Sequence, residues 1–464
     1  MIELEGFELA ETMHKWATDL FPLCRSLTGP GVRETLAYIE KLLPDLQIHE
    51  VASGTRAFDW TVPDEWTIRD AYIEDEDGNR IVDFNSNNIH VVGYSEPVDR
   101  IVELDELEEH LYSIPVQPDA IPYITSYYSR RWGFCLTHDQ RLKLKSGRYH
   151  VVIDSDLKPG VLNYAELILP GKSQKEIFLS TYICHPSMAN NELSGPVVTT
   201  ALARWLMSVK DRQHTYRIIF IPETIGSIVY LSRHMSQMKD NIIAGFNITC
   251  VGDDRCYSFM PSRAGNTLSD RAALHVLRHT DPDVKLFTWL DRGSDERQYC
   301  APGVDLPIAT IMRSKYGQYP EYHTSLDDLS LITPTGLLGG YTVIRKAIEA
   351  IQNDVYCKVT VYCEPQLGKR GLYPTLSTKE SATEVSAMMN LISYCDGSHS
   401  LLEIAEIIGE SIFKLLKILS PLITNGLIEV SGEPNAHSGG GSGEKVVLNR
   451  YMEIKETSAR GGHF

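Results

Sequence analysis

The sequence predicts an α/β protein with a doubly wound sheet, an inserted β-rich subdomain and a C-terminal winged-helix domain. Three observations lead to this prediction. Strand-like apolar runs alternate with amphipathic helical runs from residue 177 to a long helix after Pro334, as in sheets with helices on both faces. Short β-prone pieces broken by turns fill 57–166. Three helical runs and a short hairpin pattern follow between 376 and 432.

Composition limits the classes of partner. The 464-residue chain is 43% hydrophobic and 23% charged, which is typical of a globular protein of two or three domains. Its formal net charge of -17 would repel polyanions, so we expect neither nucleic acid nor an anionic membrane as partner. The first residues are acidic where a signal peptide is basic, and nine cysteines lack a CxxC pair. These features predict a cytoplasmic protein with reduced thiols.

The chain begins with two predicted helices around the turn LTGPG, followed by a strand LQIHEV near residue 47. We expect the α/β domain to comprise residues 1–56 and 167–370, with the insertion between them. The insertion contains SYYSRRWGFC, in which Arg130 and Arg131 stand out from an acidic chain. Arginine can bind a carboxylate or phosphate through two hydrogen bonds, although pairing with local surface acids is the alternative.

The stretch IFLSTYICHPSMANNELSG reads as a strand, a polar loop and the start of a helix. His185 stands at the strand end, where open α/β sheets bind their ligands. Asn191 and Glu192 follow in the loop. A lone histidine at such a place is often only structural, so the interpretation depends on what else meets it. We interpret Cys184 as a buried strand residue rather than a nucleophile.

Three more polar stretches fall at predicted strand ends. They are PETIGS around Glu223, RGSDERQY around Asp295 and YPEYHTSLDDL around His323. With His185 they supply the donor types of a hydrolytic zinc centre. In such a centre His and Asp hold the ion, an open position keeps a water, and a free carboxylate takes the proton of that water.

The C-terminal helices are predicted to form a winged helix, yet their charge does not suit DNA. Residues 376–430 hold three lysines, Lys379, Lys414 and Lys417, against seven acidic residues, a net charge of -4. A DNA-reading helix should be basic, so we expect packing or homo-oligomerisation instead. The tail 433–464, which contains SGGGSGE, is predicted to be flexible.

The turn SLTGPGV with its following helix, and the four strand-end stretches in this order, resemble zinc aminopeptidases of the M28 type. The resemblance extends to about residue 432 and is closer to a bacterial subfamily with an inserted β-domain and a C-terminal winged helix. It implies an aminopeptidase-like sheet and zinc-dependent hydrolysis of peptide bonds. His185 and His323 match zinc ligands of the family, and Glu223 matches its general base.

The chain departs from this family at three acidic positions. Asn191 stands where an Asp bridges two zinc ions, Thr224 where a second Glu is a ligand, and about Thr249 where a further Asp is expected. A neutral bridge offsets the mutual repulsion of two ions poorly. We therefore predict one zinc per chain, held by His185, His323 and Asp295. In the wider family the Asp295 position more often lies outside the ligand set, and Glu192 is an alternative, although its expected place is in solvent at the helix start.

The predicted function is zinc-dependent hydrolysis of an amide or peptide bond in a small peptide-like or aminoacyl substrate. Two alternatives stay open. One is a single-zinc cyclase or transferase on the same fold, since the relatives implied by the resemblance include glutaminyl cyclases. The other is an inactive ligand-binding or assembly protein. The loop aromatics suggest a closed pocket. The predicted substrate-binding residues are Asn191, Glu192, Arg130, Arg131, Tyr316 and Tyr322.

Overall fold

The computed structural model describes residues 6–372 and 379–434, with side chains described outside 373–383. The chain divides into two compact units. The first contains the residues up to 273 together with 283–344, and the second contains 274–282 and the residues from 345 onward. Each unit is described by itself. No helix in the described ranges has the length and apolar character needed to cross a membrane.

The first unit is built on an eight-stranded mixed sheet with the order β1-β10-β12-β11-β13-β16-β14-β15. Its centre is parallel, because β11 pairs in parallel with β12 and β13, and β13 with β16. The centre is also buried on both faces, which explains the continuous apolar run that leads to His185. The strands are β1 (Gln47–Ala52), β10 (Val161–Leu169), β11 (Ser173–Tyr182), β12 (His214–Ile221), β13 (Ile242–Ile248), β14 (Ser258–Met260), β15 (Lys285–Leu286) and β16 (Ile308–Met312).

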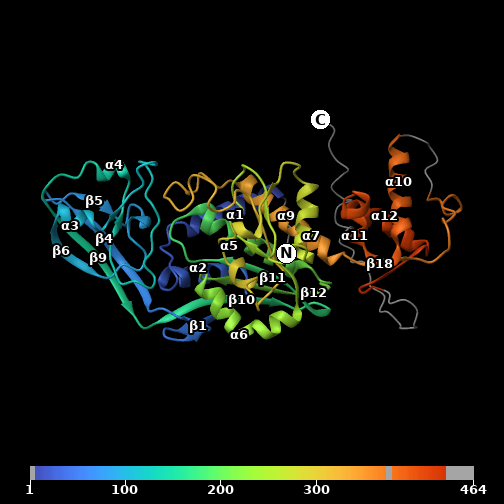
Figure 1. Cartoon of the computed structure of the whole chain (residues 1–464), viewed down its shortest axis with the longest axis horizontal. Helices are drawn as coiled ribbons and strands as arrows, with labels where there is room; N and C mark the ends of the chain where they lie inside the picture. Colours follow the sequence, from blue (N-terminus) through green and yellow to red (C-terminus); the bar gives the residue numbers. More distant parts are fainter. Residues whose placement is uncertain (1–5, 373–378, 435–464) are drawn as a thin grey trace. The chain divides into compact units, whose positions relative to one another are not determined.

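Helices cover both faces of this sheet. Helix α5 (Ser194–Ser208) connects β11 to β12, and α6 (Ile225–Asn241) connects β12 to β13 in the opposite direction along the sheet. Right-handed crossovers in opposite directions place their helices on opposite faces, as Figure 1 shows. The predicted doubly wound α/β fold is confirmed. The other helices are α1 (Gly6–Leu20), α2 (Pro30–Leu42), α7 (Leu268–Arg278), α8 (Glu296–Tyr299) and α9 (Pro334–Gln352).

The insertion folds around a four-stranded antiparallel sheet with the order β5-β4-β9-β6. From β9 the chain passes directly into β10 of the large sheet, so residues 161–166, which the sequence placed in the insertion, pair with β1. Alternating strands look alike whichever sheet they join, which is why the pattern did not show this boundary. The main strands are β4 (Glu65–Glu74), β5 (Arg80–Asp83), β6 (Val98–Glu103) and β9 (Arg148–Lys158).

The second unit is a winged helix, as the sequence predicted. Three helices pack on one another beside a three-stranded sheet with the order β18-β17-β19. Strand β17 precedes the predicted start at residue 376. The predicted tail lies outside the described residues from 435 onward. The elements are β17 (Tyr356–Val359), α10 (Lys379–Tyr394), β18 (Asp396–Ser400), α11 (Leu401–Ile408), α12 (Ile412–Thr424) and β19 (Ile428–Ser431).

Candidate metal and catalytic site

His185 follows the end of β11 and is held by a buried carboxylate. Its ring Nδ1 and its backbone N–H both donate to Glu192 Oε2, each at 3.0 Å. Glu192 Oε1 in turn accepts from Arg25 Nε at 3.1 Å, and both side chains of this ion pair are fully buried. The expectation that Glu192 points into solvent is therefore wrong. The loop 189–193 forms a π-helical turn that folds Glu192 back beneath the strand end, where Arg25 neutralises it.

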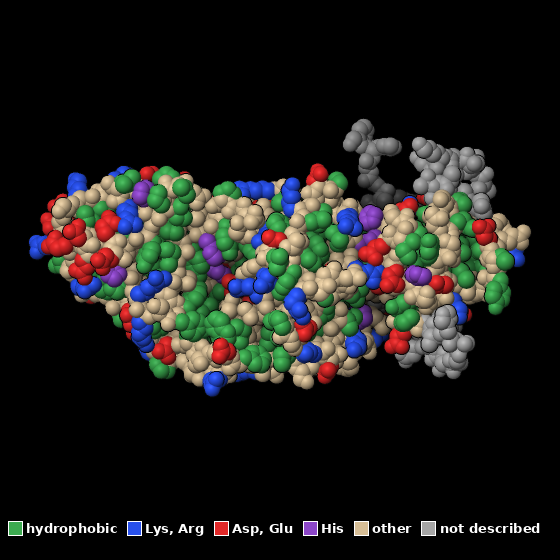
Figure 2. All heavy atoms as spheres, in the orientation of Figure 1, with side chains coloured by type: hydrophobic (Ala, Val, Ile, Leu, Met, Phe, Trp, Pro, Cys, Tyr) green, Lys and Arg blue, Asp and Glu red, His purple; other side chains and the backbone are tan. Residues whose placement is uncertain are grey.

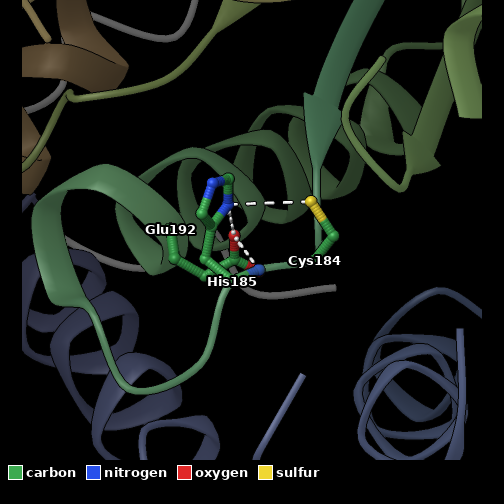
Figure 3. Close-up of side chains that lie close together, drawn as sticks. All are labelled: Cys184, His185 and Glu192. Atoms are coloured by element: carbon green, nitrogen blue, oxygen red, sulfur yellow. Dashed lines mark hydrogen bonds and ion pairs between the residues drawn. The ribbon is translucent and has the colours of Figure 1, made fainter. Parts of the chain in front are cut away.

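This arrangement decides which ring nitrogen of His185 is available. Because Nδ1 is occupied, Nε2 is the nitrogen left to face the site, as in metal-ligating histidines that donate their other N–H to a carboxylate. Figure 3 shows Glu192 and Cys184 both on the Nδ1 side of the ring. Arg25 was missed by the sequence analysis. It belongs to the turn CRSLTGPG, and nothing in that turn identifies a partner 167 positions away.

Cys184, His185 and Glu192 are the only three His, Cys, Asp or Glu side chains in the described parts of the chain whose ligand atoms lie within 4.8 Å of one another. They are poorly suited to hold an ion. Burial raises the pKa of the Cys184 thiol well above its usual value, and the thiol accepts from the Glu223 backbone N–H at 3.1 Å. Both oxygens of Glu192 are already used. The group therefore orients His185.

Glu223 follows β12 and faces the free nitrogen of His185. Its Oε2 lies 3.6 Å from His185 Nε2, and its side chain is 20% exposed. Two atoms bound to one tetrahedral zinc ion would stand about 3.4 Å apart, so this spacing suits groups that share an ion or an ion-bound water. Burial raises the pKa of Glu223, while His185 and Arg297 oppose the rise.

His323 brings a second imidazole to the same place. Its ring centroid is 5.5 Å from that of His185, and its ring nitrogens have no hydrogen-bond partner among the described residues. Burial lowers its pKa to about 3, which keeps the imidazole neutral and able to bind a metal. Tyr322 stacks on its ring at 3.9 Å. The predicted pair of histidines is therefore brought together.

The insertion contributes one wall of the site. The Tyr123 ring lies 5.2 Å from the rings of both His185 and His323, and the Tyr123 backbone N–H donates to the His323 carbonyl at 2.8 Å. Pro122 and Thr324 form a β-bridge beside it. The site thus lies where the insertion meets the C-terminal ends of the large sheet.

Three residues with strained backbones surround the site. Thr224 after β12, Cys250 after β13 and His323 have φ angles of 63°, 52° and 57°. Side chains with a β-carbon rarely adopt such angles, and a β-branched residue such as Thr224 does so least readily. Strain of this kind persists only where the surroundings enforce it, and it is concentrated at functional sites.

Asp295 lies next to Glu223 rather than between the two histidines. Its Oδ1 accepts from the Thr224 N–H and the Ser227 hydroxyl, both at 2.8 Å, while its buried Oδ2 has no hydrogen-bond partner. Burial, and then the charge of Glu223, raise the pKa of Asp295 to about 8. The like charge of Glu223 thus disfavours ionisation of Asp295. The predicted set of His185, His323 and Asp295 is not gathered within 4.8 Å.

Neutral side chains that form hydrogen bonds stand at positions where the resemblance expects acids. Asn191 Nδ2 donates to Tyr182 Oη at 2.7 Å, and the Thr249 hydroxyl lies 2.6 Å from the same oxygen. Asn191 Oδ1 is buried without a partner. Two imidazoles and a neighbouring carboxylate are donor types that fit a zinc ion.

The other predicted substrate-binding residues differ in place. Tyr322 is at the site. Tyr316 donates its hydroxyl to Glu296 Oε1 at 2.7 Å. Arg130 pairs with Asp64 and Glu96. Arg130 thus makes the pairing with local acids of the alternative interpretation, whereas Arg131 donates to the Thr125 carbonyl and lies over the Tyr112 ring. A separate cavity of about 460 Å³ adjoins the His185 loop, lined by Cys24, Trp66, Phe84, Asn88 and Ser187 among others.

Comparison with known proteins identifies the family of the chain. A family model described as a domain of unknown function, DUF4910, matches residues 14–354, and a winged helix-turn-helix model matches 354–430. The chain is 44% identical over 389 residues to a Clostridium acetobutylicum protein described as “Putative polysaccharide biosynthesis protein with aminopeptidase-like domain”, covering 83% of this chain and 89% of that one.

Two solved structures place the fold. A “putative peptidase” from Clostridium acetobutylicum superposes with a TM-score of 0.86 at 40% identity, over 92% of this chain and 97% of that chain. BSAP, a zinc aminopeptidase from Bacillus subtilis, superposes with a TM-score of 0.57 at 11% identity, over 76% of this chain and 96% of that chain. At that identity the likeness shows the fold alone.

Proposed function

The chain belongs to the DUF4910 family, and on that premise we propose that it is a zinc-dependent hydrolase of an amide or peptide bond in a small peptide-like or aminoacyl substrate. The observation that carries the proposal is the free Nε2 of His185 with the Glu223 carboxylate 3.6 Å away and the neutral His323 imidazole beside it. Nine free cysteines among the described residues support a reducing, cytoplasmic location.

His185 and His323 are the residues that would hold the ion. Two buried oxygens without hydrogen-bond partners, Asn191 Oδ1 and Asp295 Oδ2, are candidates for the third ligand. Metal content of Asn191→Ala and Asp295→Asn variants distinguishes them. A bound zinc ion supplies Lewis-acid polarisation of the scissile carbonyl.

In this proposal, proton transfer is carried out by the chain's own side chains. Glu223 is placed to take a proton from the attacking water, and burial raises its pKa toward the range useful for a general base. Tyr123 and Tyr322 cover the histidines and limit the entry of further water.

One alternative has a specific observation in its favour. Asn191, Thr224 and Thr249 replace acids, which would suit an inactive ligand-binding or assembly protein. A cyclase or transferase would use the same residues as the hydrolase, and product analysis would separate the two.

The test is a screen of aminoacyl amides and short peptides with the full chain, purified without chelator and assayed with and without added zinc. The proposal predicts hydrolysis of at least one substrate, lost on chelation and restored by zinc. Metal-independent turnover, or no turnover of any substrate by zinc-loaded protein, would contradict it.

A further inference from the structure

Arg297 is a charged residue at the site that neither the sequence motifs nor the proposed chemistry uses. It lies in the short helix α8, two residues after Asp295. Its Nε donates to the Ser294 carbonyl at 2.9 Å, and its Nη2 donates to Thr224 Oγ1 at 3.1 Å. These two bonds fix the plane of the guanidinium beside Glu223.

The guanidinium keeps donors to spare. Its Nη2 is 4.0 Å from Glu223 Oε1, which is too long for a hydrogen bond, and its Nη1 has no partner among the described residues. The side chain is 39% exposed, in contrast to the fully buried Arg25. A planar cation held at an open edge, with N–H groups unused, matches the geometry with which arginine binds a carboxylate.

The charge pattern points the same way. At Thr224 the resemblance expects a carboxylate, yet the hydroxyl there accepts from Arg297, so this position adds no negative charge beside Glu223 and Asp295 and holds a guanidinium instead. Thr224 has a strained φ angle and lies between two partners. Its hydroxyl accepts from Arg297, and its backbone N–H donates to Asp295. Such a site suits an anionic group on the substrate better than a free amino terminus.

We propose that Arg297 binds a carboxylate of the substrate, so that the substrate is a small N-acyl amino acid, with its free carboxylate on the amine side of the bond to be cleaved. This inference rests on the proposed function, since it names the substrate class of the same site. Tyr322 and Tyr123, which enclose the two histidines, supply apolar surface for the acyl part.

The test compares binding of matched probes, each N-acetyl amino acid against its carboxamide, for the twenty amino acids by calorimetry on the full chain. Wild type should bind at least one carboxylate probe about 10- to 100-fold more tightly than its amide, as for a charged hydrogen-bonded pair. Arg297→Gln should abolish this preference, and Arg297→Lys should restore part of it. Arg292→Gln is the matched control, because Arg292 is an exposed arginine five positions earlier whose guanidinium donates to the Trp289 carbonyl and lies over the Trp289 ring.

The possible outcomes separate this inference from the proposed function. No carboxylate preference for any amino acid, or a preference that survives Arg297→Gln, overturns the inference even if the protein hydrolyses amides. A preference that Arg297→Gln removes, in a protein without turnover, supports the carboxylate site and removes the hydrolase proposal instead.

Discussion

At the scale of single residues, the buried ion pair between Arg25 and Glu192 determines how His185 meets the site. The pair joins the turn after α1 to the loop after β11, and Arg25 also donates to the carbonyls of Leu20 and His185. It therefore ties together the two segments that hold the first predicted ligand. Its role is orientation of a ligand, which a buried charge network performs well because each partner is costly to leave unpaired.

The first prediction concerns that pair. Arg25→Met should lower the free energy of unfolding by about 3–5 kcal/mol, because Glu192 would be left as an uncompensated buried charge. Lys15→Met is the control, since it removes an ion pair at the surface with Asp19 and should cost no more than about 1 kcal/mol. Urea unfolding measures both. Equal midpoints for the two variants would show that the buried pair contributes nothing special.

Glu223→Gln tests the general base. Glutamine keeps the shape of the side chain but cannot take a proton, so metal content should stay near wild type while turnover falls about 100-fold or more. Glu50→Gln, at an exposed position on β1, should change neither quantity. Loss of metal from the variant would show that Glu223 is a ligand. A Gln variant that keeps most of its activity would show that another residue is the general base.

Sequence reasoning predicted the histidines and Glu223 as neighbours, because strand ends of a parallel sheet meet at one edge. It could not predict the residues that contact these side chains and hold them in place. The partner of Glu192 comes from a turn near the N-terminus, and Tyr123 reaches the site from the insertion. Arg297 lies in the predicted stretch RGSDERQY, but its place beside Glu223 depends on its contacts with Ser294 and Thr224. Such contacts depend on tertiary packing, which local periodicity does not encode.

At the scale of elements, helix α12 decides what the winged helix can bind. It carries only two lysines, and one of them, Lys414, pairs with Glu410 at 2.7 Å. Lys417 is the exposed cation on this helix. Ile407 and Tyr394 are exposed apolar side chains of the same unit.

We predict that the full chain binds duplex DNA with a dissociation constant no lower than about 100 µM at physiological salt, because helix α12 has so few cations that can neutralise phosphates. Figure 2 shows acidic and basic side chains intermixed over the face in view, without an extended basic patch. Fluorescence anisotropy with a labelled duplex measures this. Micromolar binding that weakens steeply with salt would contradict the prediction.

A histidine at the start of strand β12 leads to a prediction of how stability depends on pH. His214 begins the strand, and burial lowers its pKa to about 4, with Nδ1 unpartnered. Between pH 6.5 and 4 the unfolded chain therefore binds this proton more readily than the folded chain, so stability falls as pH falls through that window. His214→Asn should reduce the loss of unfolding free energy between pH 7 and pH 4.5 by about 1–3 kcal/mol, measured in urea. An identical pH dependence in variant and wild type would contradict this.

The elements were predicted well where strong periodicity and buried apolar runs coincide, as in β11, β12 and α5. The start of α5 shows a constraint that the sequence only hints at. A β-carbon at Gly195 would lie 2.5 Å from the carbonyl oxygen of Ile248, so the SG pair lets the helix approach β13 closely. The boundary between the insertion and the large sheet at β10 was not predictable, because the alternation of polar and apolar residues in a strand does not identify the strand with which it pairs.

At the scale of the whole molecule, we propose that the segments around His185, Glu223, Asp295 and His323, together with one loop of the insertion, build a site for one metal ion. The reason for a single ion is that neutral Asn191, Thr224 and Thr249 stand where the resemblance expects the acids that a second ion would need. The insertion is thus part of the site through Tyr123, rather than a separate module attached to the sheet.

The most direct measurement is the metal content per chain of the full-length protein, purified without chelator and analysed by mass spectrometry of the metals. We predict about one zinc per chain, and His185→Ala and His323→Ala should each remove most of it, since losing one of three ligands typically abolishes tight binding. Two tightly bound ions per chain, or one ion that both alanine variants retain, would contradict it.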